Sequence, residues 1–203
     1  MEGTNSANPA GSRTEPGPAC PVREQLLKFG IFFLGTALIV LADQLTKNWA
    51  AGTLKGGQSI TLIPDVLYLT YVENKGIAFG LFQNLQWIFV ILTVLVLAFV
   101  VFLVFRLRMN GKHIVLLAAL TCLTGGAAGN MIDRVANRYV VDFIYFSPID
   151  FPVFNVADIF VTVSCAALLL ILIFLFTDAD LDALMPARKR DGKPSGEAGE
   201  TGT

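Results

Sequence analysis

The chain has 203 residues, of which 54% are hydrophobic and 15% charged, and its mean hydropathy is +0.63. This composition excludes an ordinary soluble domain and favours a membrane protein. The net charge of −1, with basic residues dispersed among short loops and tails, excludes a nucleic-acid-binding stripe.

The chain begins with a polar segment, residues 1–21, rich in Gly, Pro, Ser, Thr and Ala. Such a composition buries too little apolar surface to offset the entropy of ordering, so we expect a disordered amino-terminal arm. A four-helix membrane domain is expected over residues 22–185, followed by a disordered basic cytoplasmic tail over residues 186–203. Cysteines are odd in number, and we expect no disulfide framework.

Four apolar stretches follow the arm, at residues 26–41, 85–105, 114–132 and 159–176. Each approaches the roughly 20 residues that a membrane-spanning helix needs, and none alternates apolar with polar residues as a soluble helix or strand does. We therefore predict an all-α membrane protein with four transmembrane helices. The first stretch is interpreted as an uncleaved span rather than a signal sequence, because Asp43, Lys47 and Asn48 separate it from the small residues that follow.

The distribution of Lys and Arg predicts the orientation, because cytoplasmic flanks of spans are enriched in positive charge. With four spans, both termini lie on one side, together with the loop between the second and third spans. That side holds ten of the fifteen basic residues, so both termini are predicted to be cytoplasmic. The polar residues that interrupt the apolar stretches then face the extracytoplasmic side.

The longer extracytoplasmic connection, residues 50–84, contains two β-prone runs at 59–63 and 67–72. Pro64 and Asp65 separate them and form a typical turn pair. We predict a small β-hairpin that lies on the membrane surface. In the shorter connection, residues 133–154, Pro148 and Pro152 prevent a continuous helix.

Four aspartates lie near the outer ends of the spans, and intramembrane carboxylates are costly enough to suggest function. Asp43 and Lys47 are spaced i, i+4, so an ion pair that anchors the first span is the favoured interpretation. Asp158 lies three residues after Asn155, a pattern that also fits a capped helix start.

Asp142 is surrounded by large apolar residues, and no helix-end or local ion-pair role explains it. Asp133 is adjacent to Arg134, which could hold it in a positioning role. The glycine-rich run at residues 125–129 lacks the Lys and Ser or Thr of a phosphate loop and favours close helix packing.

Two carboxylates that converge at the water-exposed end of a helix bundle are the smallest set of groups that can perform general acid–base hydrolysis. The only histidine, His113, lies on the predicted cytoplasmic side, which excludes a Ser/His or Cys/His site on the outer side. No metal or cofactor is expected. Two other classes stay open at this point: a small ion-coupled transporter with membrane-embedded aspartates and a non-catalytic scaffold.

The chain resembles the lipoprotein signal peptidase (signal peptidase II) family over about residues 26–176. The resemblance rests on five sequence blocks in the family's order and spacing: Asp43-Gln-Leu-Thr-Lys47, Asn74-Lys-Gly-Ile-Ala-Phe79, Gly129-Asn-Met-Ile-Asp-Arg134, Val140-Val-Asp-Phe143 and Phe154-Asn-Val-Ala-Asp158.

This resemblance implies a multi-pass aspartyl endopeptidase of the bacterial inner membrane, with its active site near the extracytoplasmic face. It implies lipidated prolipoproteins as substrates, cleavage before the cysteine that carries diacylglycerol, contact with membrane lipids, and sensitivity to globomycin. It also implies a catalytic pair, Asp142 and Asp158. The substrate-binding residues would be Asn74, Asn130, Arg134 and Asn155, and the supporting residues would be Asp43, Lys47, Gly76 and Asp133.

Overall fold

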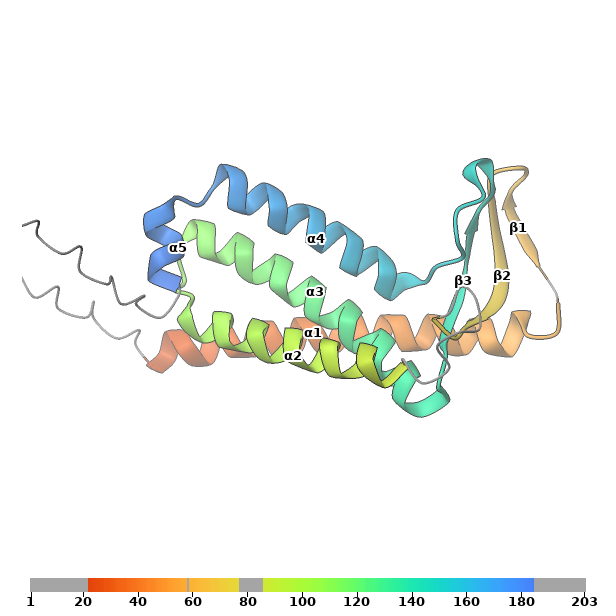
Figure 1. The fold of residues 1–203 in the computed structure, drawn as a ribbon, viewed down its shortest axis with the longest axis horizontal. Coiled ribbons are helices and arrows are strands. Elements are labelled where there is room, and N and C mark those ends of the chain that lie inside the picture. Colours follow the sequence, from red (N-terminus) through yellow and green to blue (C-terminus); the bar gives the residue numbers. More distant parts are fainter. Residues whose placement is uncertain (1–21, 58, 77–85, 185–203) are drawn as a thin grey trace, which may run out of the picture.

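The computed structural model of the chain describes residues 22–57, 59–76 and 86–184. Four long helices form a bundle: α1 (Val22–Leu54), α2 (Gln86–Arg106), α3 (Gly111–Asn137) and α4 (Val156–Phe174) (Figure 1). Each is long and apolar enough to cross a membrane, which confirms the predicted four spans. The predicted arm and tail, and Phe79 of the second sequence block, lie outside the described residues.

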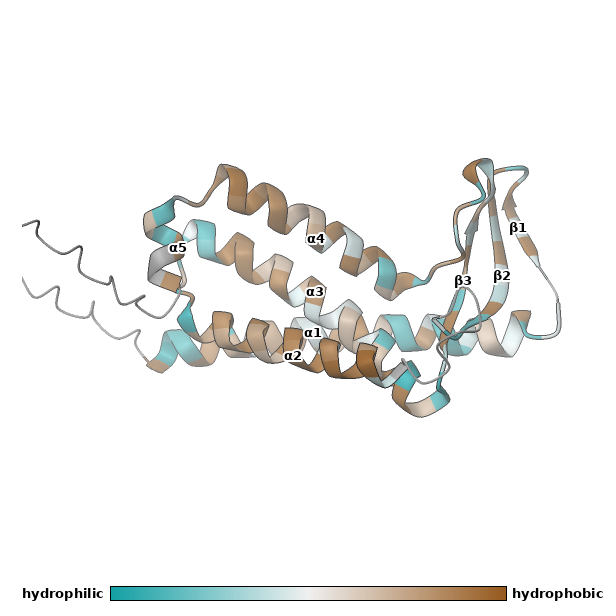
Figure 2. Cartoon of the chain, viewed as in Figure 1, coloured by the Kyte–Doolittle hydropathy of each residue, from teal (hydrophilic) through white to brown (hydrophobic). Residues whose placement is uncertain are grey.

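The bundle is organised around α3, against which α1, α2 and α4 all pack. The other three spans leave much of their apolar surface exposed, which in a membrane is the surface that meets lipid (Figure 2). The larger of two buried hydrophobic clusters lies toward the end of the bundle that is away from the β-sheet. It is formed mainly by Phe32, Val100, Val104, Leu107, Leu116, Leu117, Leu120 and Ile171.

Small residues bring α3 close to its neighbours, as the glycine-rich run predicted. A Cβ atom added to Gly125 would lie 2.6 Å from Ile39 of α1. A Cβ added to Gly126 would lie 2.5 Å from the carbonyl oxygen of Ala157 in α4. Neither distance is tolerated, so these helix contacts need glycine.

A three-stranded antiparallel sheet covers one end of the bundle, in the order β1 (Ile60–Ile63), β2 (Leu67–Asn74), β3 (Val140–Phe146). The first two strands form the predicted hairpin, and Asp65 has the positive φ of a turn residue (60°). The third strand was not predicted. It aligns Asp142 with Val72 of β2, so a segment far away in sequence completes the sheet.

Two helices, α1 and α3, extend beyond the apolar stretches from which they were predicted, and this changes where the site residues lie. α1 continues to Leu54 and α3 to Asn137, so Asp43, Lys47 and Asp133 lie on helices rather than in loops. At the other end of the molecule, a short helix that the sequence did not predict, α5 (Asp178–Leu184), follows α4.

Candidate active site

Asp142 and Asp158 come from different elements and meet beside the sheet. Asp142 lies on β3 with 1% of its surface exposed, and Asp158 lies in the first turn of α4, half-buried. The side-chain amide of Asn155 connects them: its Nδ2 donates to Asp142 Oδ1 (2.6 Å), and its Oδ1 accepts from the backbone N–H of Asp158 (3.0 Å). The geometry therefore brings the predicted pair to one place.

Two amides hold the Asp142 carboxylate. In addition to Asn155, Asn74 at the end of β2 donates from Nδ2 to Asp142 Oδ2 (2.8 Å). The Asn74 side chain is itself oriented, because its Oδ1 accepts the backbone N–H of Gly76 (2.8 Å). Gly76 has φ of +72°, a conformation that side-chain-bearing residues rarely adopt, which explains why glycine stands there.

Asp158 caps the start of α4 and also belongs to the candidate active site. It forms a capping box with Asn155, as predicted, since its Oδ2 accepts the backbone N–H of Asn155 (3.1 Å). Its Oδ1 accepts from Asn130 Nδ2 of α3 (2.7 Å). The cap fixes the side chain at the wall of the cavity that Asp142 also lines.

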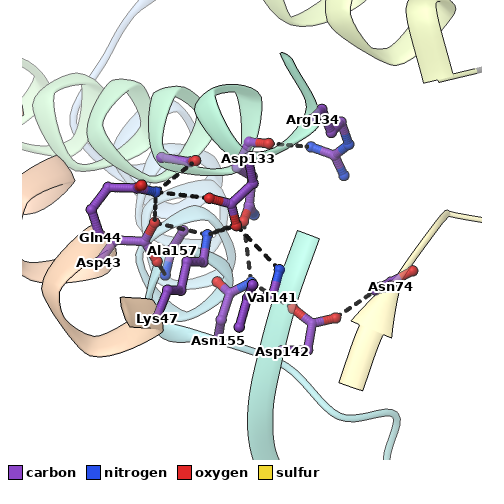
Figure 3. A network of polar contacts seen from close by, with 12 residues as sticks. Asp43, Gln44, Lys47, Asn74, Asp133, Arg134, Val141, Asp142, Asn155 and Ala157 are labelled. Carbon is purple, nitrogen blue, oxygen red and sulfur yellow. Dashed lines mark hydrogen bonds and ion pairs between the residues drawn. The ribbon is translucent and has the colours of Figure 1, made fainter. Parts of the chain in front are cut away.

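A buried charge cluster lies next to Asn155 and Asp142 (Figure 3). Lys47 Nζ contacts Asp43 Oδ2 (2.8 Å), which confirms the predicted ion pair, and Asp133 Oδ2 (3.0 Å). It also donates to Asn130 Oδ1 (2.8 Å). This last bond fixes which way the Asn130 amide points, so that Nδ2 is the atom presented to Asp158.

Asp133 is held by more partners than the sequence suggested. The sequence suggested Arg134 as a group that could hold it, and the structure adds an ion pair with Lys47 of α1. Gln44 donates to Asp133 Oδ1 (3.0 Å), and the backbone N–H of Val141 donates to Oδ2 (3.1 Å). Asp133 thereby fixes the start of β3 next to Asp142.

Asp43 reaches across the bundle to α4. Its Oδ1 accepts the backbone N–H of Ala157 (3.0 Å), one of the free amides in the first turn of that helix. The approach requires Gly129 of α3, where an added Cβ would lie 2.5 Å from Asp43 Oδ2. Asp43 therefore positions the helix start that carries Asp158.

Arg134 lies beside this group on α3. Its Nη1 donates to the carbonyl oxygen of Asn130 (3.3 Å), and its guanidinium carbon lies 5.8 Å from the centroid of the Phe89 ring on α2. The second contact is a cation–π distance. Arg134 thus stands between the polar network and the start of α2, at the end of the bundle that carries the sheet.

Asp142 and Asp158 both line a cavity of about 520 Å³. Burial raises the pKa of Asp142 to about 6; the hydrogen bonds from Asn74 and Asn155 oppose this effect, and the nearby charge of Asp158 adds to it. A carboxyl group with this pKa can gain or lose a proton near neutral pH, as acid–base hydrolysis requires.

Comparisons with known proteins assign the chain to a family. The profile of signal peptidase (SPase) II matches residues 35–175. The lipoprotein signal peptidase of Brevibacillus brevis is 42% identical over 139 residues, which is 68% of this chain and 92% of that protein. That of Clostridioides difficile is 40% identical over 144 residues, 71% of this chain and 95% of that protein.

A solved structure shares the architecture: a bacterial membrane enzyme determined by the in meso method at 1.9 Å resolution. It is 33% identical with a TM-score of 0.65, over 72% of this chain and 95% of that one. The chain belongs to the signal peptidase II family. It is an aspartic endopeptidase rather than an ion-coupled carrier or a scaffold.

In this signal peptidase II, part of the site was missed from the sequence. Gln44 was not singled out, although it binds Asp43, Asp133 and the carbonyl oxygen of Gly129. Its position within the first sequence block was the feature that could have identified Gln44 as a site residue. The cavity wall was also missed, and no sequence pattern marked it; it includes Phe151, Pro152, Val153, Phe154, Ile159, Thr162 and Val163.

Proposed function

We propose that Asp142 and Asp158 are the catalytic dyad with which this peptidase removes signal peptides from bacterial prolipoproteins, cutting before the cysteine that carries diacylglycerol. One observation carries the assignment: two carboxylates from separate elements line the same cavity, and both accept hydrogen bonds from Asn155, Asp142 from its side-chain amide and Asp158 from its backbone N–H. Asp43 and Asp133, in contrast, both pair with Lys47.

The dyad works with one shared proton. The ionised member removes a proton from a water molecule, whose oxygen attacks the scissile carbonyl. The protonated member donates to that carbonyl oxygen, and a proton then passes to the leaving amine as the C–N bond breaks. No covalent enzyme intermediate forms. Asn74, Asn130, Arg134 and Asn155 bind the substrate backbone, while Asp43, Lys47, Gly76 and Asp133 keep these groups in place.

The substrate reaches this site from the membrane. Its acyl chains stay in the bilayer while the signal helix enters between the spans, so membrane depth selects the bond that is cut. Both termini are cytoplasmic and the site is near the extracytoplasmic face, an orientation supported by the excess of Lys and Arg on the other side. In a cysteine-free background, Ile149→Cys should react with an impermeant thiol reagent added outside the cell; protection there with labelling only after lysis would reverse this orientation.

The dyad is tested with purified Asp142→Asn and Asp158→Asn variants and a lipidated precursor, read by mass. Each variant should leave the precursor uncut. Asp133→Asn is the matched control, because it removes a neighbouring buried carboxylate outside the dyad. It should retain measurable cleavage, sensitive to globomycin as in the wild type. Normal cleavage by either dyad variant, or a complete loss confined to Asp133→Asn and Asp158→Asn, would contradict the assignment.

A further inference from the structure

The cavity beside the dyad extends along the lipid-facing side of α4. Its lining on this helix consists of two pairs spaced four residues apart, Asp158 with Thr162 and Ile159 with Val163, so the four residues lie on neighbouring stripes of the helix. Ile159 is 43% exposed and Val163 62% exposed, which in a membrane means contact with lipid. Among the described residues, none of α2 or α3 lines this cavity. The cavity therefore opens from the dyad toward the bilayer rather than toward the interior of the bundle.

A second wall of the cavity is apolar and is held in place by backbone hydrogen bonds. It is the segment 151–154, in which the rings of Phe151 and Phe154 meet edge to face with their centroids 5.6 Å apart. The backbone N–H of Phe151 donates to the carbonyl oxygen of Phe146 (3.1 Å). Phe154 exchanges two backbone hydrogen bonds with Ile144 of β3 (3.0 and 2.8 Å). This wall is therefore a fixed part of the fold.

One hydroxyl group interrupts these apolar surroundings. In the lining that the structure describes, Thr162 is the one polar side chain besides Asn74 and the dyad. Other hydroxyls on the spans donate to carbonyl oxygens of their own helix, as those of Thr93 (2.8 Å) and Ser164 (2.6 Å) do. Within the described part of the chain, the Thr162 hydroxyl makes no such bond. A hydroxyl without a partner in apolar surroundings is costly, so Thr162 is suited to donate to an oxygen of a ligand.

We infer that this cavity holds the glyceryl ester of the lipidated cysteine, and that Thr162 donates a hydrogen bond to one of its ester carbonyl oxygens. The inference rests on the proposed function, in which the lipidated cysteine follows the bond cut at the dyad. Thr162 lies four residues beyond Asp158, about 6 Å along the helix axis. The cysteine side chain and the glyceryl group form a flexible link that spans this distance. From there the acyl chains pass over Ile159 and Val163 into the bilayer.

The chemistry of the cavity favours this occupant over an ordinary phospholipid. A diacylglyceryl group is uncharged and combines ester oxygens, which accept hydrogen bonds, with hydrocarbon chains. The cavity offers the complementary set, one hydroxyl donor among apolar walls that open to lipid. A phospholipid would bring a phosphate, which the carboxylates of Asp142 and Asp158 repel, and no cationic side chain lines the described part of the cavity.

The test compares two precursors that differ only at the lipidated cysteine, one with a diacylglyceryl group and one with the matching dialkyl ether, which lacks the ester carbonyls. Loss of one neutral hydrogen bond should raise the KM of the wild type for the ether about fivefold. The kcat should stay unchanged, because the ester takes no part in the reaction. Thr162→Val should raise KM for the ester precursor by the same factor and leave KM for the ether precursor unchanged. Thr162→Ser, which keeps the hydroxyl, should behave as the wild type.

The matched control is Thr93→Val, which removes a hydroxyl that is bonded to its own helix and lies outside the cavity. It should keep the wild-type KM for both precursors. The inference is overturned if the wild type has the same KM for the two precursors, a comparison that needs no variant to fold. It is also overturned if Thr162→Val leaves KM for the ester unchanged or raises KM equally for both precursors, as a hydroxyl bound to the peptide or to a phospholipid would. Failure of the proposed dyad is seen separately, as cleavage of the ester precursor by Asp158→Asn.

Discussion

Among single residues, the most informative difference is between the two carboxylates of the proposed dyad. Asp158 is constrained by its own helix, because one oxygen is used in the capping box. Asp142 has no such local partner and is held by amides from two other segments. Burial raises the pKa of Asp142 to about 6, so the charge of Asp142 is sensitive to its surroundings.

This difference gives a prediction about pH. Because the dyad needs one proton, kcat/KM should fall as pH rises through the upper apparent pKa of the pair, near 6. The Asn74 hydrogen bond stabilises the ionised carboxylate and lowers this pKa, so Asn74→Ala should move the falling limb upward by about one pH unit. The measurement is the pH dependence of cleavage, with Thr70→Ala on the same strand as the control. An unmoved limb, or one moved to lower pH, would show that Asp142 does not govern it.

Among the secondary-structure elements, the start of α4 depends on contacts from other helices. Asn155 and Asp158 cap it locally, and Asp43 of α1 accepts the N–H of Ala157. That third contact exists because Gly129 of α3 has no side chain. The orientation of Asp158 is therefore determined by three helices.

Gly129→Ala should displace Asp43 and weaken both stability and cleavage. Its Cβ would lie 2.5 Å from Asp43 Oδ2, and overpacking of this kind costs about 1–3 kcal/mol. Gly30→Ala on α1 is the matched control, since its Cβ would meet nothing within 4 Å. That change should be neutral or stabilising, by up to about 1 kcal/mol. Thermal unfolding in detergent, together with cleavage rates, tests the pair; equal behaviour of the two variants would mean that close contact at Gly129 is unimportant.

Elements also differ in how far the sequence predicts them. The four spans follow from the length of their apolar stretches, and the Asp43–Lys47 and Asn155–Asp158 contacts follow from spacing along one chain segment. β3 was missed because a short apolar run acquires its strand character only by pairing with β2, about 70 residues away. α5 was missed because seven residues give too short a pattern, and its position depends on Lys112.

At the scale of the whole molecule, Lys47 is the residue whose contacts connect α1, α3 and α4. It binds Asp43 on its own helix and Asp133 and Asn130 on α3, and through Asn130 it reaches Asp158 on α4. The sequence predicted only the first of these contacts. The other two contacts of Lys47 connect residues more than 80 positions apart, and Asn130 lies 28 positions from Asp158, so spacing along the chain cannot indicate them.

Lys47→Met should destabilise the protein strongly, because it leaves two buried carboxylates without their shared cation. Removal of one partner from a buried ion pair typically costs about 3–5 kcal/mol. Lys55→Met is the control, since its ion pair with Glu73 is largely exposed and water replaces it readily. Unfolding in detergent should separate the two variants clearly. Equal stabilities would show that the Lys47 cluster does not hold the bundle together.

The glycines of α3 also bear on turnover. Because Gly125 and Gly126 seat α1 and α4 directly against α3, those three helices form a wall without room for a peptide to pass. On the proposed route, in which the signal helix enters between the spans, the cleaved signal fragment therefore leaves sideways and partitions into the bilayer. Until it does so, it occupies the place of the next precursor. Product inhibition by free signal peptides in the same membrane is the kinetic consequence.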